Sequence, residues 1–290
     1  MKKKELILLE IDKKIRSFNL REIENYEKHS GPGFLKKIKR LILAPSIVLR
    51  LKLLNFSKKF LNKYNKIEFQ SNFELLLYFI RNLESLNELK TFKFLVKNLN
   101  ENDIFYDIGA EVGLYTALGL ELAKEVHAFE PIPYNYEILK NRFGNYKNVY
   151  LNQLALADYI GTANFCLGPT TIVEDVKNLY PDKSKEITVQ TITLDEYLKK
   201  YNKPTFIKMD VEGAEHLIIK GGYNFLKENN PILIVEILGD EFLENSMKTV
   251  NILKELGFRA YKINFDGDLE FFDYEKFKHS QGVCNYVFKK

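Results

Sequence analysis

Apolar and polar residues alternate along this chain with two different periods. Residues 4–27 predict an amphipathic helix, because their apolar side chains recur every three to four positions. These side chains are Ile7, Ile11, Ile15 and Phe18. Residues 71–83 and 89–99 carry two further helix-like patterns. The first third of the chain is therefore predicted to be helical.

From residue 103 onward, short apolar stretches alternate with helix-like stretches. The stretches that predict strands are 104–108, 126–129, 149–155, 206–209 and 232–237, and those that predict helices include 115–124 and 134–141. Such alternation is typical of βαβ units, which form a parallel sheet with helices on both faces. Two further apolar stretches, 258–263 and 283–288, predict an antiparallel pair of strands near the end of the sequence.

The charge distribution separates a basic segment from an acidic body. Residues 28–67 contain eleven Lys or Arg residues and no Asp or Glu, whereas the other residues include 32 basic and 39 acidic ones. A shift of this kind often marks a boundary in a chain. We therefore predict a basic, helical N-terminal extension over residues 1–70 and one larger α/β domain over residues 71–290.

Three roles are open for the basic segment. It could be a helical cap on the domain, because Lys stems cover apolar surface while their charges stay in water. Residues 34–64 also mix Lys and Arg with Leu, Ile and Phe, which suits contact with an anionic membrane. Lysine clusters can instead bind the phosphates of nucleic acids. No apolar run approaches the roughly 20 residues of a transmembrane helix, and no signal-peptide pattern is recognised. We expect a cytoplasmic protein, with peripheral contact at the inner membrane face as an option.

One loop combines glycines with acidic residues: Asp107-Ile108-Gly109-Ala110-Glu111-Val112-Gly113. It follows the first predicted strand and opens a helix. In open α/β sheets, ligands bind beyond the carboxyl ends of the strands, and glycines there let the backbone approach a ligand closely. Glu130 ends the next strand, where an acid can accept hydrogen bonds from both hydroxyls of a ribose.

A nicotinamide dinucleotide fits this loop poorly. The GxGxxG pattern would need glycines at positions 111 and 114, which are Glu111 and Leu114. Asp107 and Glu111 would also repel a pyrophosphate, whereas they would attract a cation. S-adenosylmethionine carries a sulfonium and an ammonium and no phosphate. It is therefore the ligand that the loop favours.

Six segments resemble, in order, those of the FkbM family of class I methyltransferases. They are FYDIGAEVGLYT (105–116), VHAFEP (126–131), NQLALADYIGTANF (152–165), TITLDEYL (191–198), FIKMDVEGAEHLIIKGG (206–222) and PILIVEI (231–237). The resemblance covers roughly residues 90–260. It implies a Rossmann-like fold with a seven-stranded, mostly parallel sheet, S-adenosylmethionine as cofactor, and O-methylation of sugars or natural-product hydroxyls.

The resemblance also implies roles for particular residues. Asp107, Gly109 and Gly113 would line the methionine end of the cofactor, Glu130 would hold its ribose, and Asp158 would meet the adenine amino group. These positions all match the family's motifs.

Glu111 departs from the family, which usually has Asn at this position. An ionised carboxylate only accepts hydrogen bonds, whereas Asn also donates them. Glu111 is therefore predicted either to bind the ammonium of the cofactor or to weaken the site, and the sequence leaves both options open.

Catalysis is expected at the end of the fourth strand of the predicted sheet. A sugar hydroxyl reacts better when a base takes its proton, and Asp210 and His216 are the candidates for this base, with Glu236 as the residue that orients it. The alternatives are that Asp210 and Glu212 cap the following helix and that His216 is merely solvated. The four histidines of the chain are scattered, so no metal site is predicted.

These observations predict an S-adenosylmethionine-dependent O-methyltransferase that acts on a sugar hydroxyl of a glycan or glycolipid. A lipid-linked acceptor would suit a membrane-contacting segment. Two alternatives are a catalytically weak, methyltransferase-like binding module and an RNA methyltransferase that uses the basic segment. Nucleic acid is the less favoured partner, because Asp210-Val211-Glu212-Gly213 stands where many base methyltransferases have an Asn- or Asp-Pro-Pro-aromatic motif.

Overall fold

The computed structural model describes residues 3–18, 70–83, 85–167, 170–171, 186–239, 242–280 and 282–290. The basic segment 28–67, including the predicted membrane-contacting residues 34–64, lies outside this described part. Among the helices of the described residues, none is both long enough and apolar enough to cross a membrane.

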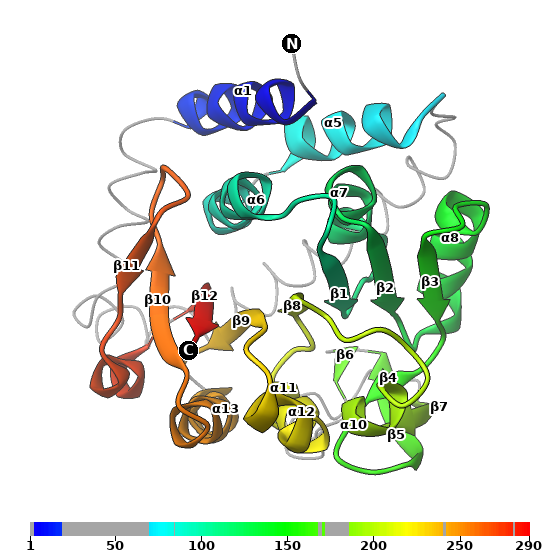
Figure 1. Cartoon of the computed structure of the whole chain (residues 1–290), viewed down its shortest axis with the longest axis vertical. Coiled ribbons are helices and arrows are strands. Elements are labelled where there is room, and N and C mark those ends of the chain that lie inside the picture. The colour runs from blue at the N-terminus through cyan, green and yellow to red at the C-terminus, as the bar shows by residue number, and fades with distance from the viewer. Residues whose placement is uncertain are drawn as a thin grey trace.

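The centre of the molecule is a mixed sheet of eight strands (Figure 1). Its strands are β1 Ile104–Ile108, β2 Glu125–Phe129, β3 Val149–Asn152, β8 Phe206–Met209, β9 Ile232–Leu238, β10 Arg259–Ile263, β11 Leu269–Phe271 and β12 Val283–Lys289. They lie in the order β11-β10-β12-β9-β8-β1-β2-β3. The five strands from β9 to β3 are parallel, whereas β12, β10 and β11 join by antiparallel pairing. The predicted α/β class and the antiparallel pair of β10 and β12 are confirmed.

The sheet has one strand more than the seven predicted. The additional strand, β11, is three residues long and pairs with β10 at the edge of the sheet. Asn264 closes the hairpin between them, because its side-chain oxygen accepts hydrogen bonds from the backbone N–H groups of Asp266 and Asp268. Three residues are too few to show an alternating pattern, so the turn rather than the strand carries the sequence signal.

A second sheet of four strands lies beside the carboxyl end of β3 (Figure 1). Its strands are β4 Ala155–Leu156, β5 Gly161–Leu167, β6 Thr170–Thr171 and β7 Glu186–Ile192. The predicted strand 149–155 is therefore wrong beyond Asn152, since Ala155 pairs with Thr191 of β7 in this other sheet. No Gly or Pro marks the break, and the two polar residues Asn152 and Gln153 are its only local sign.

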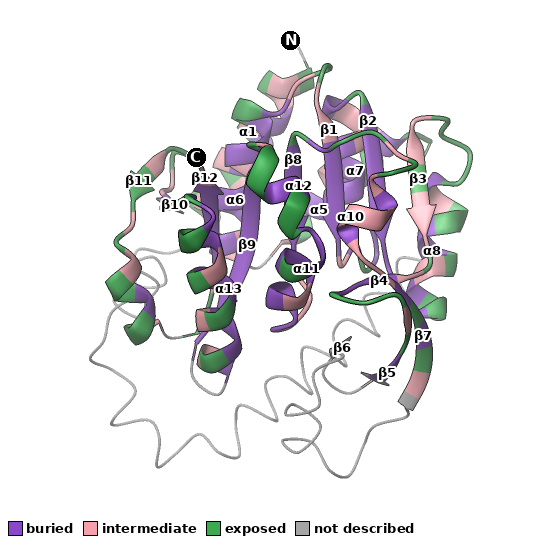
Figure 2. Ribbon diagram, turned by 60° about the horizontal axis from the view of Figure 1, so that its bottom comes forward, coloured by how far each residue is buried: buried purple, intermediate pink, exposed green. Residues whose placement is uncertain are grey.

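Helices cover both faces of the central sheet, as predicted (Figure 1). One face carries α6 Leu86–Asn98, α7 Leu114–Leu122 and α8 Pro133–Phe143, and α1 Lys3–Ser17 and α5 Asn72–Asn82 form an outer layer over α6 and α7. The other carries α10 Leu194–Tyr197, α11 Glu215–Gly221, α12 Tyr223–Glu228, α13 Leu243–Glu255 and the 3-10 helix η2 Tyr274–His279. Figure 2 shows the central strands buried between these layers and the outer sides of α12 and α13 exposed.

Polar residues begin several of these helices. The side chains of Ser71, Ser85 and Thr193 accept hydrogen bonds from the backbone N–H group three residues later, which satisfies an otherwise unpaired donor at each helix start. The Glu74 carboxylate accepts a further hydrogen bond at the start of α5, from the backbone N–H of Gln70, one residue before the N-cap. Glu88 stands in the same Ser-x-x-Glu pattern, but its side chain points elsewhere.

Helix α1 packs directly on the larger domain. Ile7 and Ile11 are fully buried and belong to the same hydrophobic cluster as Leu89 and Phe92 of α6. The apolar stripe predicted for residues 4–27 is therefore confirmed through Phe18, and residues 19–27 lie outside the described part. The division of the chain near residue 70 stays a prediction.

Candidate active site

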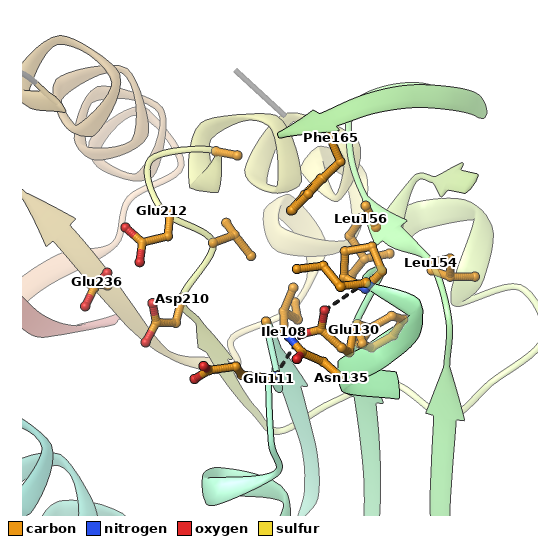
Figure 3. Close-up of a pocket in the computed structure, with 17 residues that line it drawn as sticks. Ile108, Glu111, Glu130, Asn135, Leu154, Leu156, Phe165, Asp210, Glu212 and Glu236 are labelled. Carbon is orange, nitrogen blue, oxygen red and sulfur yellow. Dashed lines mark hydrogen bonds between the residues drawn. The ribbon is translucent and has the colours of Figure 1, made fainter. Parts of the chain in front are cut away.

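A cavity of about 310 Å³ opens at the carboxyl ends of the parallel strands (Figure 3). Its lining comes mainly from the segments that follow β1, β2, β3 and β8, together with β9 and the second sheet. The volume lies at the lower end of the range for small-molecule sites. Five predicted site residues line this cavity: Gly109, Glu111, Glu130, Asp210 and Glu236.

The loop after β1 approaches the neighbouring strand too closely for a side chain. Gly109 has a φ of +84°, and a Cβ at this position would lie 2.0 Å from the backbone oxygen of Asp210. Gly113 has a φ of +89° and begins α7, where a Cβ would lie 2.3 Å from the ring of Phe143. Both positions therefore require glycine. Gly113 shapes the loop from behind and does not line the cavity.

Asp107 also supports the loop from behind the cavity. It is buried, and the Thr116 hydroxyl donates a hydrogen bond of 2.6 Å to its Oδ2. Burial raises the pKa of Asp107 to about 6, while the bond from Thr116 opposes this rise. The structure thus places Asp107 between β1 and the first turn of α7.

Glu130 holds the first two loops of the site together. Its Oε2 accepts a 2.9 Å hydrogen bond from the backbone N–H of Glu111, and its Oε1 accepts one of 2.9 Å from Ile132 (Figure 3). Burial raises the pKa of Glu130 to about 8 in spite of these two donors. Each carboxylate oxygen has a further lone pair, so Glu130 can accept two additional hydroxyl donors from a ligand in the cavity.

A network of charged side chains lies beside the cavity at the ends of β8 and β9. The Lys208 ammonium is fully buried and lies 3.1 Å from Asp210 Oδ2. Carboxylate oxygens of Glu88, Asp210 and Glu236 lie within 4.8 Å of one another. Burial raises the pKa of Glu236 well above its usual value, and the nearby charge of Asp210 adds to this effect. Glu236 is thus a carboxyl group that holds a proton readily.

Glu88 joins this network from α6. Its carboxylate accepts hydrogen bonds from the Tyr115 hydroxyl and, at 3.0 Å, from the Asn285 amide. Burial raises the pKa of Glu88, and the charge of Lys208 opposes the rise. Two side chains from outside the family-like segments, Glu88 and Asn285, therefore reach the catalytic candidates.

The loop after β8 is fixed by Glu215. Its Oε1 accepts hydrogen bonds from the backbone N–H groups of Val211 and Gly213, at 3.1 and 3.3 Å. Helix α11 follows Ala214 without any side-chain cap. The alternative in which Asp210 or Glu212 caps this helix is therefore not seen.

Besides Asp107 and Gly113, two further predicted residues lie apart from the cavity lining. His216 is buried in the first turn of α11, and burial together with Lys220 and Lys248 lowers its pKa. Asp158 is exposed after β4. The structure brings neither of them into the group formed by Asp210 and Glu236, so their predicted roles have no support from the lining.

Sequence reasoning missed Glu88, Lys208 and Asn285. Lys208 lies inside the quoted motif FIKMDVEGAE, and a lysine within an apolar strand needs a buried partner. Glu88 has the pattern of a capping box, which assigns its carboxylate to the helix start. Asn285 carries no local signal, because it lies 197 positions from the glutamate that it contacts.

Comparisons with known proteins agree with this geometry. The family model described as "Methyltransferase FkbM domain" matches residues 107–262, which is more than half of the chain. The hexuronic acid methyltransferase AglP of Haloferax volcanii is 27% identical over 184 residues, which cover 62% of this chain and 74% of that protein.

Solved structures of methyltransferases are also similar to the chain. One is the methyltransferase FkbM from Methylobacillus flagellatus KT, with 15% identity and a TM-score of 0.44; the match covers 82% of this chain and 60% of that one. Another is a putative methyltransferase from Streptococcus mutans in complex with SAH, with 15% identity and a TM-score of 0.43; it covers 72% and 99%. From the family match, the chain belongs to the FkbM family of S-adenosylmethionine-dependent methyltransferases.

Proposed function

We propose that the protein transfers a methyl group from S-adenosylmethionine to a hydroxyl of a sugar within a glycan or glycolipid. The observation that carries the proposal is one cavity that combines Glu130, at the end of β2, with Asp210 and Glu236, at the ends of β8 and β9. The similarity to a methyltransferase named for a hexuronic acid supports a sugar as the acceptor.

The cofactor fits the residues that this cavity presents. Gly109 lines the cavity, so its backbone is available to a ligand there. Glu130 would accept hydrogen bonds from the ribose hydroxyls, and the apolar side chains of Leu154, Leu156 and Phe165 would contact the adenine ring. Bound there, S-adenosylmethionine supplies a methyl group on a positively charged sulfur.

Asp210 and Glu236 would act on the acceptor. The hydroxyl must lose its proton as its oxygen bonds to the methyl carbon, and a nearby base promotes this loss. Lys208 holds the Asp210 carboxylate in place, while Glu236 lies in an environment that favours its protonated form. We assign proton acceptance to Asp210, which is partly open to the cavity, and the orienting role to Glu236.

Mass spectrometry of glycans and glycolipids from cells with and without the protein tests this proposal. We expect a sugar in the cells with the protein to be heavier by one methylene group. Identical glycan profiles, together with S-adenosylmethionine binding by the purified chain, would favour the binding module instead. The cavity brings carboxylates together where an acceptor would bind, which favours an enzyme over a binding module.

A further inference from the structure

The cavity has two chemically different walls (Figure 3). One wall is apolar and consists of Leu154, Leu156 and Phe165, whereas the opposite wall carries the carboxylates of Glu111, Asp210, Glu212 and Glu236. Under the proposed function, on which this inference rests, the apolar wall and Glu130 take the adenosine part of the cofactor. The acidic wall then faces the methionine part and the acceptor.

The acidic side chains are held in place by the fold. Glu236 is buried and Asp210 is bonded to Lys208. Glu111 and Glu212 have φ values of 48° and 54°, and within the described part of the chain they are the two non-glycine residues with positive φ. This backbone conformation is unfavourable for residues with a Cβ and concentrates at functional sites. The wall is thus a built feature of the cavity.

Among the described residues, positive charge reaches this wall only from behind. The residues that line the cavity in the described structure include no Lys, Arg or His. Lys208 is fully buried and is engaged by the Asp210 carboxylate and the Met209 backbone oxygen. It offsets one negative charge of the wall, and it is not placed to bind an anionic acceptor in the cavity.

We propose that the acidic wall selects an uncharged sugar and rejects sugars that carry a carboxylate or a phosphate, with Glu212 as a determinant of this selection. Hydroxyl groups of a neutral sugar donate to carboxylates in charge-assisted hydrogen bonds. An acceptor carboxylate would instead meet the negative charge of Glu212 and the partly offset charge of Asp210 in a partly enclosed space, where repulsion is stronger than in water.

Three acceptors test whether the charge or the shape of the sugar determines its methylation. They are a glycan that ends in a neutral hexose, the same glycan ending in a hexuronic acid, and the methyl ester of that hexuronic acid. The full chain should methylate the hexoside and the ester with a kcat/KM at least about tenfold above that of the free acid, because like charges in contact discriminate strongly. Added salt should raise the kcat/KM for the free acid more than that for the other two acceptors, because salt screens the repulsion.

The variant Glu212→Gln keeps the size of the side chain and removes its charge. It should reduce the preference for the ester over the free acid by about two- to fivefold, since Glu212 is only partly buried. Any change in its affinity for S-adenosylmethionine affects both acceptors alike and therefore cancels in this ratio. Glu255→Gln, an exposed position on α13, is the matched control and should retain the full preference.

The outcomes distinguish this inference from the function on which it rests. Methylation of the free hexuronic acid as fast as its ester would overturn charge selection, and the enzyme would still be a sugar methyltransferase. Equal preference in the Glu212→Gln variant and the native chain would remove Glu212 from the selection. If none of the three acceptors is methylated, while calorimetry shows cofactor binding, the proposed function itself fails, and this inference fails with it.

Discussion

Single carboxylates decide much of the chemistry of this site, and Glu130 is the first to test. Its two oxygens already accept backbone hydrogen bonds from Glu111 and Ile132. If they also accept the ribose hydroxyls, Glu130→Ala should weaken S-adenosylmethionine binding by about ten- to a hundredfold. Calorimetry measures this loss, with Glu137→Ala on the exposed side of α8 as a control. Unchanged affinity in a folded variant would place the ribose elsewhere.

The titration of Glu130 should be visible in the stability of the cofactor-free protein. Burial raises its pKa to about 8 from 4.5, so between these values the folded state holds a proton that the unfolded state releases. The free energy of unfolding should therefore fall as the pH rises through this window. Glu130→Gln should make the decline shallower by up to about 1.4 kcal/mol per pH unit. Denaturant titrations across this pH range would show equal slopes if Glu130 does not titrate there.

Asp210 is the residue that we propose as the base of the reaction. Asp210→Asn keeps the shape and removes the negative charge and the basicity, so turnover should fall by about 10²–10⁴ while cofactor affinity survives. His216→Gln should change turnover far less, because His216 lies outside the cavity lining. Steady-state kinetics on a glycan acceptor compares the two. Near-normal turnover of Asp210→Asn would remove Asp210 from the role of base.

At the scale of elements, the contact between the loop after β1 and the end of β8 shapes the cofactor site. Gly109→Ala combines a positive φ with a Cβ only 2.0 Å from a backbone oxygen. Gly257→Ala is a matched control, because Gly257 has a φ of +83° and nothing within 4 Å of the added Cβ. Backbone strain should lower the free energy of unfolding of each variant by about 1–3 kcal/mol. The close contact should lower that of Gly109→Ala further and should also weaken its cofactor binding.

Thermal unfolding and calorimetry on the two glycine variants separate the effect of backbone strain from the effect of the close contact with Asp210. Equal destabilisation of both, with normal cofactor affinity, would show that the loop can move away from β8. The close approach of these two elements would then have no role in binding.

At the scale of the whole molecule, helix α1 is part of the folded body. Ile11 is fully buried in the cluster that includes α5 and α6, whereas Leu9 on the same helix is 42% exposed. Ile11→Ala should therefore lower the free energy of unfolding by about 2–5 kcal/mol, and Leu9→Ala by less than about 0.5–1 kcal/mol. Denaturant unfolding of both variants tests this. Similar small losses would mean that α1 docks without stabilising the domain.

The sequence by itself determined the elements whose signals are local. The bounds of β1 and β8 match the prediction, because each is a short apolar run buried between helix layers. Gly109 and Glu130 were also identified, since a loop with positive φ and a strand end are both visible in neighbouring residues. The second sheet was not identified, because only the polar pair Asn152-Gln153 separates β3 from β4, and the pairing partners of the two strands are not visible in neighbouring residues.

Only the tertiary structure decided which side chains meet at the site. Glu88, Lys208 and Asn285 come from α6, β8 and β12, and strand order brings β12 beside β9 so that Asn285 lies opposite Glu236. His216 follows Asp210 closely in sequence, yet the turn into α11 takes it out of the cavity lining. A residue's own pattern fixes its secondary structure, whereas its partners depend on how distant strands and helices pack. The acidic wall of the cavity is therefore a product of the fold.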